Sequence, residues 1–186
     1  MQKSFISAQE LLSKSIDLAH IIFKSGYRPN FIVGIWRGGA PIGICVQETL
    51  DYLGIPTDHI AIRTSSYQGM ERQNKAIRVH GLRYIEKNIN ADDQLLIIDD
   101  VFDTGLSIQK VIEELKSACR KNTPDIKVAT TYFKPKNNKT HRAPDFYVKQ
   151  THNWLVFPHE LKGLTPEEIE QYRPQIHKII SENICA

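Results

Sequence analysis

The clearest signal in this sequence is the segment Leu95-Leu96-Ile97-Ile98-Asp99-Asp100-Val101-Phe102-Asp103-Thr104-Gly105-Leu106-Ser107. Its apolar first part is typical of a strand inside a parallel sheet, because helices cover both faces of such a sheet. Ligands of these sheets bind beyond the carboxyl ends of the strands. At that end the segment places three acids and then Thr-Gly-x-Ser, which opens a helix. The segment therefore predicts a ligand site at the tip of a central strand.

The acids and the turn after them suit different parts of one ligand. The backbone N–H groups of residues 104–107 open a helix, lack intrahelical partners and lie at the positive end of its dipole, so they suit a phosphate group. Gly105 lets that anion approach the backbone closely. Asp99 and Asp100 only accept hydrogen bonds when ionised, so they suit sugar hydroxyls or a hydrated Mg²⁺ ion. Together these groups describe a site for a phosphorylated ribose.

A simpler explanation is that Asp103 or Thr104 only caps the helix, as both residue types often do. Capping accounts for one of the three acids. Unpaired charges at the end of a buried strand are costly, so we interpret the other two acids as ligand-binding groups.

The rest of the chain alternates between strands and helices, which predicts an α/β fold with a mostly parallel central sheet flanked by helices. We expect strands at residues 31–36, 59–64, 77–80, 95–98, 126–133, 146–149 and 154–157, and helices at 8–25, 40–52, 107–120 and 165–184. Pro174 should kink or split the last helix. The polar residues 65–76 have no period and predict a mobile loop. The first helix should turn one apolar side to the core, formed by Leu11, Leu12, Ile16, Ala19, Ile22 and Phe23.

Length and composition limit the class of protein. The chain has 186 residues, of which 41% are hydrophobic and 24% charged, which predicts a single domain over residues 1–186. A net charge of +3 is too small to indicate a nucleic-acid partner. The three cysteines are far apart, which favours reduced thiols in a cytoplasmic protein. No apolar run approaches the ~20 residues of a membrane span, and the first residues are not typical of a secretion signal, so we expect no membrane partner.

Residues 99–107 resemble the phosphoribosyl-pyrophosphate (PRPP) motif of the type I phosphoribosyltransferases. That motif is a strand end with two acids, two apolar residues and then Asp-Thr-Gly-x-Thr/Ser. The resemblance covers about residues 30–161 and implies the fold of that family, with a small hood and a C-terminal helical extension at about 165–184. It implies that Asp99 and Asp100 hold the ribose 2′- and 3′-hydroxyls and Mg²⁺, and that a loop binds the 5′-phosphate. The residues of this loop are Asp103, Thr104, Gly105, Leu106 and Ser107, the last standing where the family usually has Thr.

Two further segments resemble parts of the same family's site. Trp36-Arg37-Gly38-Gly39 by itself is typical of a plain strand-to-helix turn, but it also resembles the pyrophosphate loop of the family. The resemblance implies that Arg37 and Gly38 bind PRPP and that the peptide bond before this arginine is cis. Ser66 and Tyr67 match the Ser-Tyr pair of the hypoxanthine-guanine enzymes, which implies a lid that closes over PRPP.

A third group of residues resembles a purine pocket. A lysine at a strand end, such as Lys134, often only extends to water, but in the 6-oxopurine enzymes it donates to purine O6, and an ammonium group selects an oxo group over an amine. Trp154 and Leu155 resemble the base pocket of the xanthine-guanine enzymes, in which the indole stacks on the purine and the backbone meets its 2-position edge. A Trp in an apolar run is more often a core residue. Glu160 stands where those enzymes more often have Asp, which implies a place near Mg²⁺.

The resemblance implies a cytoplasmic purine-salvage glycosyltransferase that depends on Mg²⁺ and belongs to the hypoxanthine/xanthine-guanine branch. Such an enzyme transfers the 5-phosphoribosyl group from PRPP to N9 of hypoxanthine, guanine or xanthine, and releases a purine nucleoside monophosphate and pyrophosphate. The resemblance also implies that Asp103 contacts purine N7 and acts as the general base. A homodimer or homotetramer is usual in this family, and we expect one here. The sequence does not fix the preference among the three bases.

Two other functions fit parts of the pattern. A regulator on the same fold would keep the PRPP or nucleotide site and bind RNA or operator DNA, typically through a basic face and without the residues of a base pocket. A receiver-type signalling domain also has paired acids after a strand, but these lie near the start of the chain and no Asp-Thr-Gly turn follows them. The presence of Lys134, Trp154 and Glu160 favours the enzyme.

Overall fold

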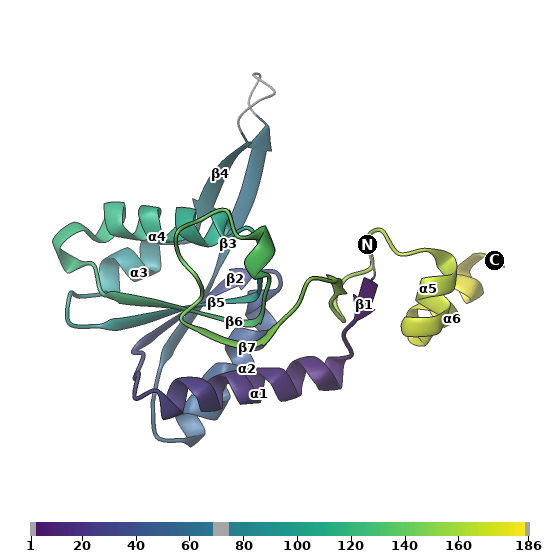
Figure 1. The fold of residues 1–186 in the computed structure, drawn as a ribbon, viewed down its shortest axis with the longest axis horizontal. Coiled ribbons are helices and arrows are strands. Elements are labelled where there is room, and N and C mark those ends of the chain that lie inside the picture. The colour runs from purple at the N-terminus through teal and green to yellow at the C-terminus, as the bar shows by residue number, and fades with distance from the viewer. Residues whose placement is uncertain (1–2, 69–74, 185–186) are drawn as a thin grey trace. The chain divides into compact units, whose positions relative to one another are not determined.

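A computed structural model describes residues 3–68 and 75–184, and the chain divides into two compact units. The larger unit covers residues 9–152, and the smaller one joins the start of the chain to the residues from 153 onward. Figure 1 shows the elements of each unit. The single domain expected over residues 1–186 remains a prediction.

A six-stranded sheet forms the centre of the larger unit (Figure 1). Every neighbouring pair of strands is parallel except the pair at one edge, where β4 runs antiparallel to β3. This arrangement confirms the mostly parallel α/β fold. In order across the sheet, the strands are β4 (Lys75–His80), β3 (Asp58–Gln68), β2 (Phe31–Trp36), β5 (Gln94–Phe102), β6 (Asp125–Phe133) and β7 (Phe146–Gln150).

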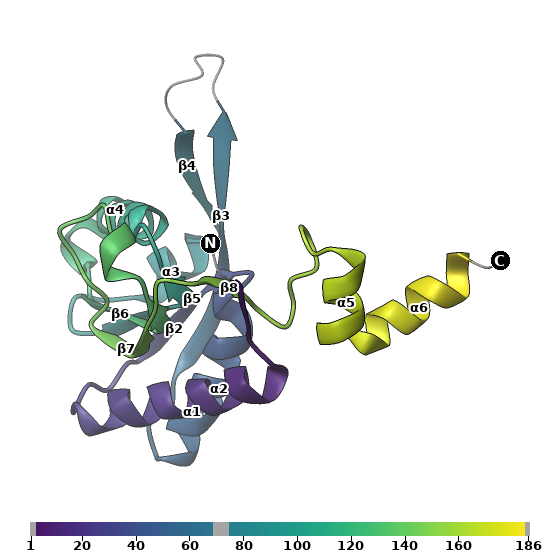
Figure 2. The same cartoon turned by 45° about the vertical axis from the view of Figure 1, so that its right-hand side comes forward.

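The apolar half of β5 is buried on both faces of this sheet. Leu95 and Ile97 belong to a core cluster that includes residues of α3 and α4. Because side chains alternate along a strand, Leu96 and Ile98 point to the opposite face, and both are fully buried. Figures 1 and 2 show α3 and α4 on one face of the sheet and α1 and α2 on the other. These helices are α1 (Ala8–Lys24), α2 (Gly39–Tyr52), α3 (Arg83–Asn88) and α4 (Leu106–Cys119).

The prediction of a loop at residues 65–76 is wrong at both ends of that segment, where the structure has strands. β3 continues to Gln68 and β4 begins at Lys75, and the two strands pair from Ser65 opposite Arg78 to Gln68 opposite Lys75. The ladder joins backbone groups, so it does not need an apolar pattern. Figures 1 and 2 show this hairpin extending beyond the layer that the helices cover, which is why its sequence is polar. The remaining residues of the predicted loop, 69–74, lie outside the described residues.

The buried face of α1 also differs from the prediction. Leu12 and Ile16 are 47% and 46% exposed, whereas Leu18 is fully buried. Ser15 lies on the buried face, where its hydroxyl donates to the carbonyl of Leu11 at 2.8 Å. Leu11, Ala19 and Ile22 are buried as predicted. The local hydrogen bond lets Ser15 take a core position, so the apolar pattern is wrong at Leu12 and Ile16.

The smaller unit has its own short sheet and two helices. β1 (Lys3–Phe5) pairs in parallel with β8 (Trp154–Val156), and α5 (Pro166–Tyr172) is followed directly by α6 (Pro174–Ile184). The break falls at Pro174, as predicted. Lys3 forms a 2.8 Å ion pair with Glu168, whose backbone N–H and carboxylate complete a capping box at the start of α5. None of the helices in the described part of the chain has the length and apolarity of a membrane span.

Candidate active site

The paired carboxylates lie at the carboxyl end of β5. The backbone N–H of Asp100 donates to Asp99 Oδ1 at 3.0 Å, and the N–H of Val101 donates to Asp100 Oδ1 at 2.7 Å. Burial and the neighbouring Asp100 carboxylate raise the pKa of Asp99 well above its usual range. Two neighbouring carboxylates favour a cation or hydroxyl donors beside them, and the binding of a ribose or a metal ion here remains a prediction.

The turn after β2 passes directly over these acids. A Cβ atom added to Gly38 would lie 1.8 Å from Asp100 Oδ2, and one added to Gly39 would lie 2.2 Å from the carbonyl oxygen of Ile98. Only glycine permits an approach this close. The peptide bond between Trp36 and Arg37 is cis, as the resemblance implied. The predicted pyrophosphate loop and the predicted ribose site therefore adjoin each other in the structure.

The predicted phosphate loop connects β5 to α4. Gly105 has a left-handed backbone with φ of 76°, and a Cβ atom there would lie 2.6 Å from the Phe102 ring. Leu106, the first residue of α4, is exposed. A cavity of about 90 Å³ opens at this loop. It is lined by Asp99, Val101, Asp103, Thr104, Gly105, Ser107 and Ile108.

Asp103 is held by two side chains from the end of β6. Lys134 Nζ lies 3.1 Å from Asp103 Oδ2, and Asn137 Nδ2 donates to Asp103 Oδ1 at 2.7 Å. Lys134 is only 5% exposed, so the interpretation that it merely extends to water is wrong. Its backbone N–H donates to the carbonyl of Phe102 at 2.9 Å, which joins the ends of the two strands. The structure thus brings Lys134 to the acid that follows β5.

Asn137 was not predicted as a site residue. It lies in a short 3-10 helix, Pro135–Asn137, directly after Lys134. The only signal in the sequence is an amide residue close to a strand end that already carries a lysine. Such residues are common in turns, so the contact with Asp103 is visible only once β5 and β6 are placed side by side.

The remaining purine-site and metal-site residues lie in the smaller unit. Trp154 is 56% exposed on β8, so it is not the core residue that its apolar neighbours suggested. Leu155 is buried. Glu160 Oε2 accepts a 3.0 Å hydrogen bond from the backbone N–H of Phe157. The place of these residues beside a purine or a metal ion remains a prediction.

The predicted lid residues, Ser66 and Tyr67, lie on β3, where they pair with Ile77 and Ala76. Their side chains lie outside the described part of the structure. Their contact with PRPP remains a prediction.

The residues at the strand tip suit a metal ion that is bound partly by the substrate. Within residues 3–68 and 75–184, no three or more His, Cys, Asp or Glu side chains gather into a group that could hold a metal ion. Mg²⁺ is commonly held by one or two carboxylates together with phosphate oxygens of the substrate and water. Asp99 and Asp100 provide such a pair of carboxylates, so they fit this mode of binding.

Comparisons with known proteins agree with this fold. Residues 1–162 match the model of the phosphoribosyl transferase domain. The chain therefore belongs to the phosphoribosyl transferase domain family. A comparison with curated proteins finds no match.

Several solved structures have a fold similar to that of this chain. A purine phosphoribosyltransferase from Pyrococcus horikoshii is 26% identical, with a TM-score of 0.71 over 89% of this chain and 99% of that chain. A xanthine-guanine-hypoxanthine phosphoribosyltransferase from Helicobacter pylori is 19% identical, with a TM-score of 0.70 over 95% and 100% of the two chains. A hypothetical protein from Neisseria gonorrhoeae with bound ppGpp is 18% identical, with a TM-score of 0.70 over 93% of this chain and 94% of that chain.

Proposed function

We propose that this protein is a Mg²⁺-dependent purine phosphoribosyltransferase that transfers the 5-phosphoribosyl group from PRPP to N9 of a 6-oxopurine. The observation that carries the proposal is the buried Lys134, paired with Asp103 beside the PRPP-like loop. The similarity to the Pyrococcus horikoshii purine phosphoribosyltransferase, at 26% identity, supports a purine as the base.

The Lys134–Asp103 pair supplies both a donor and an acceptor to a purine. The ammonium group has only donors, so it suits O6 of hypoxanthine, guanine or xanthine and repels the amino group of adenine. The Asp103 carboxylate suits the N7–H of the same base and can hold its proton while N9 attacks the ribose. A base that enters this site exchanges the ion pair for these two contacts, so the buried Lys134 keeps a hydrogen-bond partner.

The other residues of the strand tip would orient PRPP. Asp99 and Asp100 accept hydrogen bonds from the ribose hydroxyls, and the loop from Thr104 to Ser107 binds the 5′-phosphate through its N–H groups. These contacts hold the reacting ribose carbon against N9, which accelerates the reaction by orienting the two reactants. Arg37 neutralises charge that grows on the leaving pyrophosphate. A bound Mg²⁺ ion would add further neutralisation of that charge.

A turnover assay tests this proposal directly. The full chain is incubated with PRPP, MgCl₂ and each of hypoxanthine, guanine, xanthine and adenine, and the nucleoside monophosphates are separated by chromatography. We expect product from at least one 6-oxopurine and at least tenfold less from adenine. Binding of PRPP with no product from any base would contradict the enzyme and favour the regulator on the same fold.

The Lys134→Gln variant tests the residue that selects the base. An amide can accept as well as donate, so we expect the ratio of oxopurine to adenine turnover to fall. Lys136→Gln provides the matched control, because that lysine is exposed in the adjoining turn. An unchanged base preference in Lys134→Gln would contradict the assigned role.

A further inference from the structure

A second cavity lies beside the phosphate loop. It is a groove of about 450 Å³ between α4 and the segment 140–142. That volume falls within the range of small-molecule sites. Gly105 lines both this groove and the small cavity of the phosphate loop. Ile108 also lines both cavities, and all their other lining residues differ.

The groove has an apolar floor and a mostly basic rim. Its floor includes Phe102, Ile108 and Ile112, which would contact a flat apolar body. The basic residues of the rim are Lys116, His141 and Arg142, and its one acid is Glu113. Gln109 also lies on the rim, where its Nε2 donates to Glu113 Oε1 at 2.9 Å.

One basic residue of the rim has its donors available, and Arg142 also lines the groove. Lys116 forms no ion pair with another described residue. The Nε atom of Arg142 is buried and has no hydrogen-bond acceptor in the described part of the chain. The rim therefore suits an anionic group.

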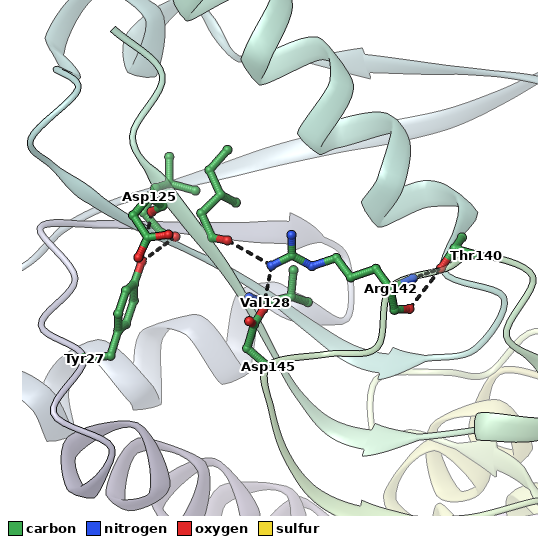
Figure 3. Close-up of polar contacts among 8 residues, drawn as sticks. Tyr27, Asp125, Val128, Thr140, Arg142 and Asp145 are labelled. Carbon is green, nitrogen blue, oxygen red and sulfur yellow. Dashed lines mark hydrogen bonds and ion pairs between the residues drawn. The ribbon is translucent and has the colours of Figure 1, made fainter.

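The wall opposite α4 is held in place by contacts within the chain, without a ligand. Arg142 Nη2 donates to the carbonyl of Ile126 on β6 at 2.9 Å and pairs with Asp145 at 2.6 Å. Figure 3 shows Arg142 beside Asp145. Asp145 in turn accepts from the N–H of Val128 at 2.8 Å. Thr140 closes the turn by donating to the carbonyl of Arg142 at 3.0 Å (Figure 3). A preformed wall lowers the ordering cost of binding.

We propose that this groove is a second ligand site, which binds a small organic anion with an aromatic body. The body lies on Phe102, Ile108 and Ile112, and the anionic group faces Lys116 and Arg142. The proposal does not depend on the purine phosphoribosyltransferase activity, because it rests on residues outside the ribose and purine sites.

The probe for this site is 2-naphthoate, an aromatic ring system with one carboxylate, titrated into the full chain by isothermal calorimetry. We expect saturable one-site binding that weakens at least tenfold in Lys116→Glu. Lys110→Glu is the matched control, since it makes the same charge change on the same helix but does not line the groove. The affinity of that control for 2-naphthoate should stay within twofold of the affinity of the unmodified chain. A second variant, Gln109→Trp, places a bulky ring at the exposed rim and should also abolish binding.

Two further measurements test where the probe binds and why. The neutral analogue 2-naphthalenemethanol should bind at least fivefold more weakly, and equal binding would overturn the anionic class. Lys134→Gln, in the candidate active site, should leave the affinity unchanged, and a loss there would place the probe in the active site instead. Equal affinities for the unmodified chain, Lys116→Glu and Gln109→Trp would overturn the second site, as would the absence of any binding.

Discussion

The ion pair between Asp103 and Lys134, at 3.1 Å, joins the residue that follows β5 to the residue that follows β6. It brings an acceptor and a donor to the same side of the strand tip, beside the predicted phosphate loop. Lys134 depends on this contact, because it is buried and needs a counter-charge. Substitutions at this pair can therefore separate effects on the chemical step from effects on PRPP binding.

Asp103→Asn should reduce turnover far more than PRPP binding. The amide keeps the shape of the side chain but cannot hold the purine proton, so we expect kcat to fall about 100-fold or more, the usual size of a general-base effect. The Kd for PRPP, measured by calorimetry, should stay within threefold. Asp92→Asn, at an exposed position before β5, serves as the control. Equal losses in kcat and PRPP affinity would show that Asp103 acts only through the phosphate loop.

Asn137→Ala should reduce kcat without a comparable change in the KM for PRPP. Asn137 donates to Asp103 Oδ1 at 2.7 Å and so fixes the carboxylate that faces the base. A hydrogen bond to a charged group is worth about 1.5 kcal/mol or more, and this one is partly solvated, so we expect a loss of about fivefold to tenfold. Asn137→Ser, which keeps a donor, should recover part of the activity. A rise in the KM for PRPP alone would contradict this positioning role.

The strand tip could be predicted from sequence because its signals are local. The apolar run before Asp99 and the Thr-Gly-x-Ser turn are contiguous, so neither needs knowledge of the fold. The cis peptide bond before Arg37 was likewise implied by the motif around it and is present. The contact between Asp103 and Asn137 spans 34 residues and depends on the pairing of β5 with β6. No local pattern encodes it, which is why it was missed.

Several elements escaped prediction for physical reasons. β1 and α3 have three and six residues, too few to show a period. The ends of the β3–β4 hairpin have no apolar pattern because helices do not cover them (Figure 2). Leu12 and Ile16 look like core residues, but Ser15 takes the buried position by bonding to its own helix. Hydrophobic pattern alone therefore fails where local hydrogen bonds replace apolar contacts.

Gly38→Ala should weaken PRPP binding without unfolding the protein. The added Cβ would lie 1.8 Å from Asp100 Oδ2, so this carboxylate or the turn above it must move. Because Asp100 is predicted to bind the ribose, we expect the Kd for PRPP to rise at least tenfold. The midpoint of thermal unfolding should fall by only a few degrees, since 1 kcal/mol corresponds to about 2–4 °C for a chain of this size. An unchanged Kd would show that the acid does not contact PRPP.

His59 should make the free energy of unfolding depend on pH. Its Nδ1 lies 3.1 Å from Gln47 Oε1, while its Nε2 is buried without a partner among the described residues, close to Gly34 and Gly43. Burial lowers the pKa of His59 in the folded state, and the nearby Asp58 opposes this only in part. The unfolded value is about 6.5, so the folded protein binds the proton less readily than the unfolded chain. The stability that comes from neutral His59 is therefore fully present above about pH 6.5 and is lost as the pH falls through the folded pKa.

Urea unfolding at pH 7.5 and pH 5.0 measures this contribution. The unmodified protein should lose more free energy of unfolding between the two values than His59→Gln, which cannot titrate. His20→Gln is the matched control, because that histidine is exposed on α1, and it should keep the full pH dependence. The same slope in all three proteins would mean that other groups cause the loss of stability in acid, and that the buried Nε2 is satisfied in both protonation states.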